Sequence, residues 1–231
     1  MSRPNILTLG CSNSSTSWGL SWPDFVSENL NYNLLRASSN GAGNAFFIEK
    51  LHYVLRHSKV DLVIIQLTEP SRVVLGLTKK EKKSINEALI DSHSINDIGC
   101  YTWSVNDNEA NLKRETGFDI KINNFWNDQV VTSKWIDYKV MQDVATMQYL
   151  CESFNVSCIF WSWFKNMEEL FIEPYSWLKP KIKWIPGSAG QWLYKNNIMN
   201  KPELGGHYNT EDHKKLTNEW LQPEINKLLC R

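Results

Sequence analysis

The sequence has no long apolar segment, no excess of charge of either sign and no cysteine spacing typical of a metal site. No apolar run approaches the ~20 residues that a membrane-spanning helix needs, and the N-terminus lacks the basic and then apolar pattern of a secretory signal. Lysine plus arginine and aspartate plus glutamate number 25 each, so no net field favours nucleic acid or an anionic membrane. These absences predict a cytoplasmic enzyme or binding domain without nucleic-acid or membrane partners.

Cofactor motifs are also absent. The five cysteines are an odd number and resemble reduced intracellular thiols rather than a disulfide framework. The segment Asn40-Gly-Ala-Gly-Asn44 is rich in glycine, but it lacks the dinucleotide fingerprint and the Gly-Lys-Ser/Thr of a phosphate loop. We therefore expect no metal and no organic cofactor. A nucleotide-binding domain stays open as a weaker alternative.

Strand and helix patterns alternate along the 231 residues, which fit one domain over residues 1–231. Strands are predicted at residues 4–9, 33–37, 61–67, 156–161 and 182–185. Helices are predicted over residues 21–30, from 44 to about 55, over 78–90 and 137–154, and from 210. The continuous aliphatic run at 61–67 indicates a strand that is buried on both faces. The expected fold is a three-layer α/β/α structure with a flavodoxin-like, parallel five-stranded sheet.

Two features of the sequence leave alternatives open. Residues 91–135 are polar and weakly periodic, so we interpret them as an insertion, with a lid or a substrate-facing segment as its possible role. Eleven tryptophans are unusual for this length, and they fit either core packing or a stacking wall for a sugar or a base.

The candidate chemistry lies in two segments far apart in the chain. An apolar strand runs directly into Gly10-Cys-Ser12, which places the Ser12 hydroxyl at the carboxyl end of a strand. A histidine, His207, follows Gly205-Gly206 ahead of the last helix. If the fold brings Ser12 and His207 together, they form the core of a nucleophilic hydrolase. Cys11 is a weaker alternative nucleophile.

Together with the Asn40–Asn44 turn, these segments resemble the motifs of the SGNH (GDSL-type) hydrolases, a family of α/β/α esterases and acyl hydrolases. The resemblance spans most of the chain outside residues 91–135. It implies that Ser12 is the nucleophile and His207 the general base. It further implies that the backbone N–H groups of Ser12 and Gly41 bind the oxyanion.

Two motif positions depart from the family pattern. Its third motif supplies an asparagine to the oxyanion hole, whereas this chain has Thr68-Glu-Pro-Ser71, so that Asn44, Thr68 or Arg72 would have to stand in. Its fourth motif places an aspartate two or three residues before the histidine, where this chain has Leu204 and Gly205. Glu203 is the nearest carboxylate and Asp212 the next. A Ser–His dyad and a loss of catalysis are the other possibilities.

The favoured function is a serine hydrolase that cleaves an ester or O-acyl group of a carbohydrate or lipid through an acyl-enzyme. Its partner would be a small-molecule or glycan ester. Transfer of the acyl group to an acceptor hydroxyl is a second possibility on the same scaffold. The alternative outside enzymology is a catalytically impaired domain that binds a glycan or protein, or that takes part in an assembly.

Overall fold

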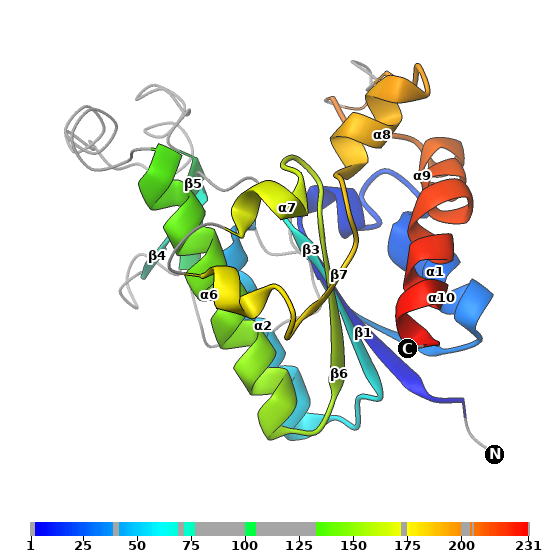
Figure 1. Cartoon of the computed structure of the whole chain (residues 1–231). Helices are drawn as coiled ribbons and strands as arrows, with labels where there is room; N and C mark the ends of the chain where they lie inside the picture. Colours follow the sequence, from blue (N-terminus) through cyan, green and yellow to red (C-terminus); the bar gives the residue numbers. More distant parts are fainter. Residues whose placement is uncertain are drawn as a thin grey trace.

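Five parallel strands form the central sheet of the computed structural model, in the order β2-β1-β3-β6-β7 (Figure 1). The structure describes residues 3–38, 42–68, 72–76, 100–104, 133–171, 175–199, 204 and 206–230, with the backbone alone for 72–76, 100–104 and 133–136. The strands are β1 (Asn5–Gly10), β2 (Asn33–Ser38), β3 (Leu62–Leu67), β6 (Ser157–Ser162) and β7 (Lys183–Trp184). This is the flavodoxin-like order, so the predicted architecture is confirmed.

β3 lies in the middle of the sheet because its side chains suit burial on both faces. All six of its residues are buried. It pairs with β1, where Ile6 lies opposite Leu62, and with β6, where Leu62 lies opposite Ser157. A strand that is covered on both sides in this way needs the continuous aliphatic run that the sequence shows.

Helices cover both faces of the sheet (Figure 1). One face carries α1 (Trp22–Leu30), α9 (Thr210–Leu216) and α10 (Gln222–Leu229), with a π-helical segment, η5 (Thr217–Leu221), between α9 and α10. The other face carries α2 (Asn44–His57) and α6 (Ser133–Ser153). Shorter elements are η1 (Ser12–Ser14), α7 (Met167–Leu170), η3 (Ser176–Leu178) and α8 (Ala189–Lys195).

Alternate residues of each strand supply the two apolar cores. Leu7 and Val63 point to the face covered by α2 and α6, and they pack into the same cluster as Leu51. Ile6 and Ile64 point to the opposite face and pack with the α1, α9 and α10 side chains. The period of two along a strand therefore divides the apolar residues between the layers.

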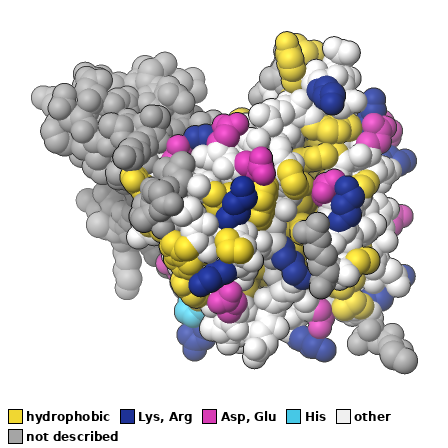
Figure 2. Space-filling view, in the orientation of Figure 1, with side chains coloured by type: hydrophobic (Ala, Val, Ile, Leu, Met, Phe, Trp, Pro, Cys, Tyr) yellow, Lys and Arg dark blue, Asp and Glu magenta, His cyan; other side chains and the backbone are white. Residues whose placement is uncertain are grey.

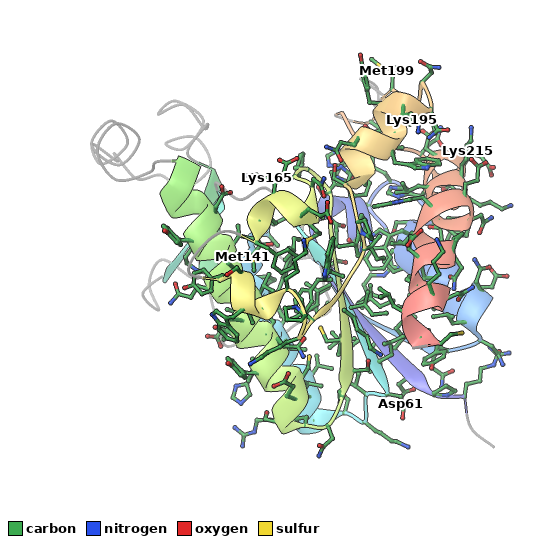
Figure 3. The ribbon with its side chains drawn as sticks, viewed as in Figure 1. Asp61, Met141, Lys165, Lys195, Met199 and Lys215 are labelled. Atoms are coloured by element: carbon green, nitrogen blue, oxygen red, sulfur yellow. The ribbon has the colours of Figure 1, made fainter. Side chains whose placement is uncertain are left out.

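The strands all end at the same edge of the sheet. Figure 3 labels Asp61, just before β3, at one end of the molecule, and Lys165, just after β6, toward the other. η1, the dark blue turn that follows β1 in Figure 1, lies at the second of these edges. Open parallel sheets bind ligands outside the carboxyl ends of their strands, so this edge is where a site is expected.

A second, two-stranded antiparallel sheet was not predicted. It consists of β4 (Arg72–Gly76) and β5 (Cys100–Ser104), with Arg72 opposite Ser104. β5 falls inside the predicted insertion at 91–135. Most of that insertion, and the helix predicted at 78–90, lie outside the described residues.

The described surface shows no separation of charge on the face drawn in Figure 2, where basic and acidic side chains are interspersed. No helix among the described residues combines the length and apolar character needed to cross a bilayer. Cys11, Cys151, Cys158 and Cys230 are free thiols, and the first three of them are buried.

Candidate active site

Ser12 begins a short turn immediately after the first strand. Cys11 caps the 3₁₀ turn η1, and Ser12 is its first residue. Gly10 allows the chain to enter this turn, because a Cβ atom at Gly10 would lie 1.9 Å from Ser14 Oγ and 2.9 Å from Gln66 Oε1. Only glycine fits so close an approach. The glycine two residues before Ser12 thus fixes the position of its hydroxyl.

A buried network of hydrogen bonds around Gln66 holds the turn η1 in place. Gln66 Oε1 accepts hydrogen bonds from Ser14 Oγ and from Trp22 Nε1, the latter at 3.2 Å. Trp22 Nε1 also lies 2.8 Å from Ser14 Oγ, and Gln66 Nε2 donates to Cys11 Sγ at 3.1 Å. Sequence reasoning missed Gln66, although one amide inside the aliphatic β3 run was a signal. Cys11 is 1% exposed and engaged in this network, which disfavours it as a nucleophile.

The predicted meeting of Ser12 and His207 is present. Ser12 Oγ lies 2.8 Å from His207 Nε2, across 195 residues of sequence. His207 Nδ1 lies 3.0 Å from the carbonyl oxygen of Leu204. A carbonyl oxygen only accepts, so Nδ1 carries the proton and the Nε2 lone pair faces the serine hydroxyl. This is the tautomer that a general base requires.

An indole ring covers one face of this imidazole. The rings of Trp18 and His207 stack with centroids 3.9 Å apart and planes 9° from parallel. Trp18 was among the tryptophans with an open role, and nothing in the sequence indicated that it contacts His207. Trp18 and His207 also line a small hollow beside the nucleophile, together with Ser12, Asn13, Leu20 and Tyr208.

The fold of this chain is similar to that of several proteins of known structure. No family model and no curated protein sequence matches the chain. Among solved structures, the esterase EstA from Pseudoalteromonas is similar with a TM-score of 0.54 at 11% identity, covering 98% of this chain and 100% of EstA. TesA has a TM-score of 0.52 at 15% identity, with 97% and 99% covered. A putative G-D-S-L lipolytic protein from Desulfitobacterium hafniense has 0.51 at 11%, with 97% and 98% covered.

The chain has the SGNH hydrolase fold. The resemblance predicted from the short motifs is confirmed for the architecture, over nearly the full length of these proteins.

Two of the oxyanion-hole candidates, Asn44 and Thr68, are in contact with each other. Asn44, the first residue of α2, is 4% exposed, and its Oδ1 accepts the backbone N–H of Thr68 at 2.9 Å. Because only the amide oxygen can accept from an N–H, the Asn44 NH₂ group points away from Thr68. Gly41 lies outside the described residues, and Arg72 begins β4 with its side chain outside the description.

The third member of an SGNH triad is not supplied by Asp212. The Asp212 carboxylate instead accepts the backbone N–H of Asn209 at 3.3 Å, and the Asn209 side chain accepts the Asp212 N–H at 2.9 Å. This capping box begins α9. Glu203 lies outside the described residues. Within the described part of the chain, the group that orients His207 is the Leu204 carbonyl.

A second histidine, His213, lies close by in α9. Its side chain is 4% exposed, and burial lowers its pKa to about 4, with the nearby Asp24 carboxylate opposing the shift and His207 adding to it. The ring is therefore neutral near pH 7. It packs against Trp163 and Tyr208, and its Nδ1 has no hydrogen-bond partner. A buried, neutral ring packed in this way is typical of a structural histidine. No group of three or more His, Cys, Asp or Glu residues suited to a metal ion occurs among the described residues.

Proposed function

We propose that the chain is an SGNH-type serine hydrolase that cleaves an ester or O-acyl group of a carbohydrate or lipid. The observation that carries the proposal is the 2.8 Å contact between Ser12 Oγ and His207 Nε2, in a ring whose other nitrogen is held by a carbonyl. A nucleophile, a base and a group that orients the base are the recurrent parts of such enzymes.

The reaction follows from this geometry. His207 Nε2 takes the hydroxyl proton as Ser12 Oγ attacks the ester carbonyl, and a tetrahedral oxyanion forms. The imidazolium then gives its proton to the leaving alcohol, which leaves an acyl group on Ser12. A water molecule then attacks the acyl carbonyl as the same nitrogen takes its proton. That proton passes to Ser12 Oγ as the acyl C–O bond breaks, and the carboxylic acid leaves.

Three donors are available for the oxyanion in this proposal. As the first residue of a 3₁₀ turn, Ser12 has no acceptor within the turn for its backbone N–H. The Asn44 NH₂ group would replace the asparagine that the third motif lacks, because its oxygen is anchored at Thr68. Gly41 would contribute a backbone N–H, as the resemblance implies. One such donor is worth roughly 3 kcal/mol of transition-state stabilisation.

Among the described residues, the orientation of His207 would rest on a backbone carbonyl and not on a carboxylate. The Leu204 oxygen fixes the tautomer as an aspartate does, but it carries only a partial charge. The imidazolium that forms during attack is then less well compensated, and we expect a Ser–His dyad that is slower than a full triad.

Hydrolysis of p-nitrophenyl esters of increasing chain length tests the proposal. Ser12→Ala and His207→Gln should each lower kcat by about 10³-fold or more, because each removes a reacting group. His52→Gln, a substitution of an exposed histidine on α2, is the matched control and should keep wild-type activity. Equal turnover by Ser12→Ala and wild type would contradict the proposal.

A binding or assembly module is the second candidate, favoured by the missing asparagine in the segment Thr68-Glu-Pro-Ser71 and by the capping role of Asp212. Such a module would turn over none of the esters. It would also retain glycan binding on an array after the Ser12→Ala substitution, and that pair of results selects it over the hydrolase.

A further inference from the structure

We propose that Trp18 is the positioning residue of His207, and that its indole compensates for the carboxylate that the described part of the site does not place at Nδ1. This inference rests on the proposed hydrolase function and adds a residue to it. The observation behind it is the parallel stack, with ring centroids 3.9 Å apart and planes at 9°. No SGNH motif quoted above includes this position.

The stack adds a steric restraint to the two hydrogen bonds that orient the ring. His207 Nε2 and Nδ1 are held at Ser12 Oγ and at the Leu204 oxygen. Rotation about the Cβ–Cγ bond would break both of these contacts. An indole parallel to the imidazole blocks this rotation on one face and keeps the Nε2 lone pair directed at the hydroxyl.

The indole face also suits the charge that the ring acquires. When His207 takes the proton from Ser12, it becomes an imidazolium that lies directly over the electron-rich face of Trp18. A cation in that position is attracted by the quadrupole of the ring. Since the attraction acts on the charged form, it stabilises the transition state more than the resting enzyme.

The turn that carries Trp18 is itself held in place. Gly19 has φ +107°, and a Cβ atom there would lie 2.5 Å from Thr210 Oγ1 at the start of α9. The Gly19 N–H donates to the Thr16 carbonyl at 3.1 Å. On its other side, Ser15 Oγ donates to the Ser12 carbonyl at 2.9 Å. The turn is thus hydrogen-bonded to the backbone of Ser12, and Gly19 lies close to Thr210 at the start of α9.

The other ionisable groups near His207 are either neutral or engaged in contacts of their own. His213, on α9, faces it as a neutral ring, because burial lowers its pKa to about 4. Burial and the Asp212 carboxylate raise the pKa of Tyr208, so the phenol is neutral too. Asp24, on α1, is paired with Arg36 at 2.5 Å. Asp212 is held in the α9 capping box.

The test compares Trp18→Leu with Trp18→Phe in ester hydrolysis. We expect Trp18→Leu to lower kcat by roughly 5- to 30-fold, with KM changed less than about twofold, and to move the midpoint of the acid limb of kcat/KM down by about one pH unit. Trp18→Phe keeps an aromatic face and should recover most of both effects. Trp177→Leu, a substitution of a 41% exposed tryptophan distant in sequence from the site, is the matched control.

A merely structural role for Trp18 predicts a different result. Trp18→Leu would then lower activity by the same factor at every pH, Trp18→Phe would not rescue it, and the acid limb would stay in place. That outcome overturns the inference.

A proton NMR measurement tests the stack independently of activity. The His207 Cε1–H resonance, assigned by its loss in His207→Gln, should lie upfield from the indole ring current and move downfield in Trp18→Leu. An unchanged resonance overturns the inference. Should Ser12→Ala keep wild-type activity, the proposed function fails, whatever the resonance shows. Should Ser12→Ala be inactive while Trp18→Leu matches wild type in kcat and pH profile, only the role of Trp18 fails.

Discussion

The two faces of the sheet are built from different side chains. The face under α2 and α6 is packed mostly with Leu, Val, Ile, Met and Phe, as in the pair Leu51 and Phe160. The face under α1, α9 and α10 buries Trp22, Trp161 and Trp163, with Trp22 and Trp161 edge to face at 5.1 Å. The core interpretation of the tryptophans is therefore correct for these three.

Two buried polar side chains, Gln66 and His213, lie on the aromatic face of the sheet. Gln66 lies on β3 in register with Leu62 and Ile64, which belong to the aromatic core, and its amide bonds to the indole of Trp22. His213 packs on the same side against Trp163. An indole supplies both apolar area and an N–H donor, so Trp22 gives the buried Gln66 amide a hydrogen-bond partner. The aromatic face therefore supports the turn that carries Ser12, while the aliphatic core contributes mainly stability, apart from Asn44 at the start of α2.

The largest expected effect on stability comes from truncating a side chain in the aliphatic core. Leu51→Ala removes a fully buried side chain of α2 and should lower the free energy of unfolding by about 3 kcal/mol, through lost burial and the cavity left behind. Urea denaturation measures the loss. If the two faces differ as described, kcat/KM of the folded variant stays at the wild-type value. A large fall in kcat/KM would contradict the view that the aliphatic core contributes mainly stability.

The next effect is a pH dependence that arises on the aromatic face. The pKa of His213 is about 4 in the folded chain, below its ordinary value of 6.5, so the unfolded chain binds more protons between these pH values. The stability contribution is fully present above about pH 6.5 and declines as the pH falls toward 4. Between pH 7 and pH 5 it amounts to about 2 kcal/mol.

Urea denaturation of His213→Gln at both pH values isolates this contribution. The variant should lose about 2 kcal/mol less than wild type on going from pH 7 to pH 5. His52→Gln, with an exposed histidine, should follow wild type. Identical pH dependence in wild type and His213→Gln would show that His213 is not buried in its neutral form.

Substitution of Gln66 should lower stability less than Leu51→Ala does, but it should lower activity more. Gln66→Met keeps the side-chain volume and deletes the partners of Ser14, Trp22 and Cys11, which should lower stability by about 2 kcal/mol. The turn that carries Ser12 is then no longer fixed, and a displacement of about 1 Å costs on the order of 10²-fold in kcat. Steady-state kinetics of Gln66→Met and Leu51→Ala, measured side by side, compare the effects of the two faces on activity. Retention of full activity by Gln66→Met would contradict the view that the aromatic face supports the turn that carries Ser12.

The sequence was informative about the fold because burial leaves a pattern. The β3 run at 61–67 and the alternation of strand and helix predicted the sheet, and Ser12 and His207 were paired through the motifs on its edge. The β4–β5 sheet could not be predicted, because it pairs two short segments that lie far apart in sequence and have weak periodicity. Gln66 was overlooked because a single polar residue in a strand does not reveal its partners.

The details of the site depend on side-chain directions that spacing does not encode. The expected third triad members are carboxylates, whereas the group at His207 Nδ1 is the Leu204 carbonyl, which any residue type would provide. Asp212 was a candidate by distance in sequence and serves as a helix cap instead. The stack of Trp18 on His207 joins residues 189 positions apart, beyond what motif reading resolves.

The central claim is that the alcohol of Ser12 reacts as a nucleophile activated by His207. A fluorophosphonate reacts with an activated serine hydroxyl and not with an ordinary one, so it is a suitable probe of Ser12. The direct measurement is mass spectrometry of the protein after treatment with a fluorophosphonate, with the modified peptide sequenced. The account predicts one adduct on Ser12 in wild type and none in Ser12→Ala. Equal labelling of both proteins, or no labelling of wild type, would contradict it.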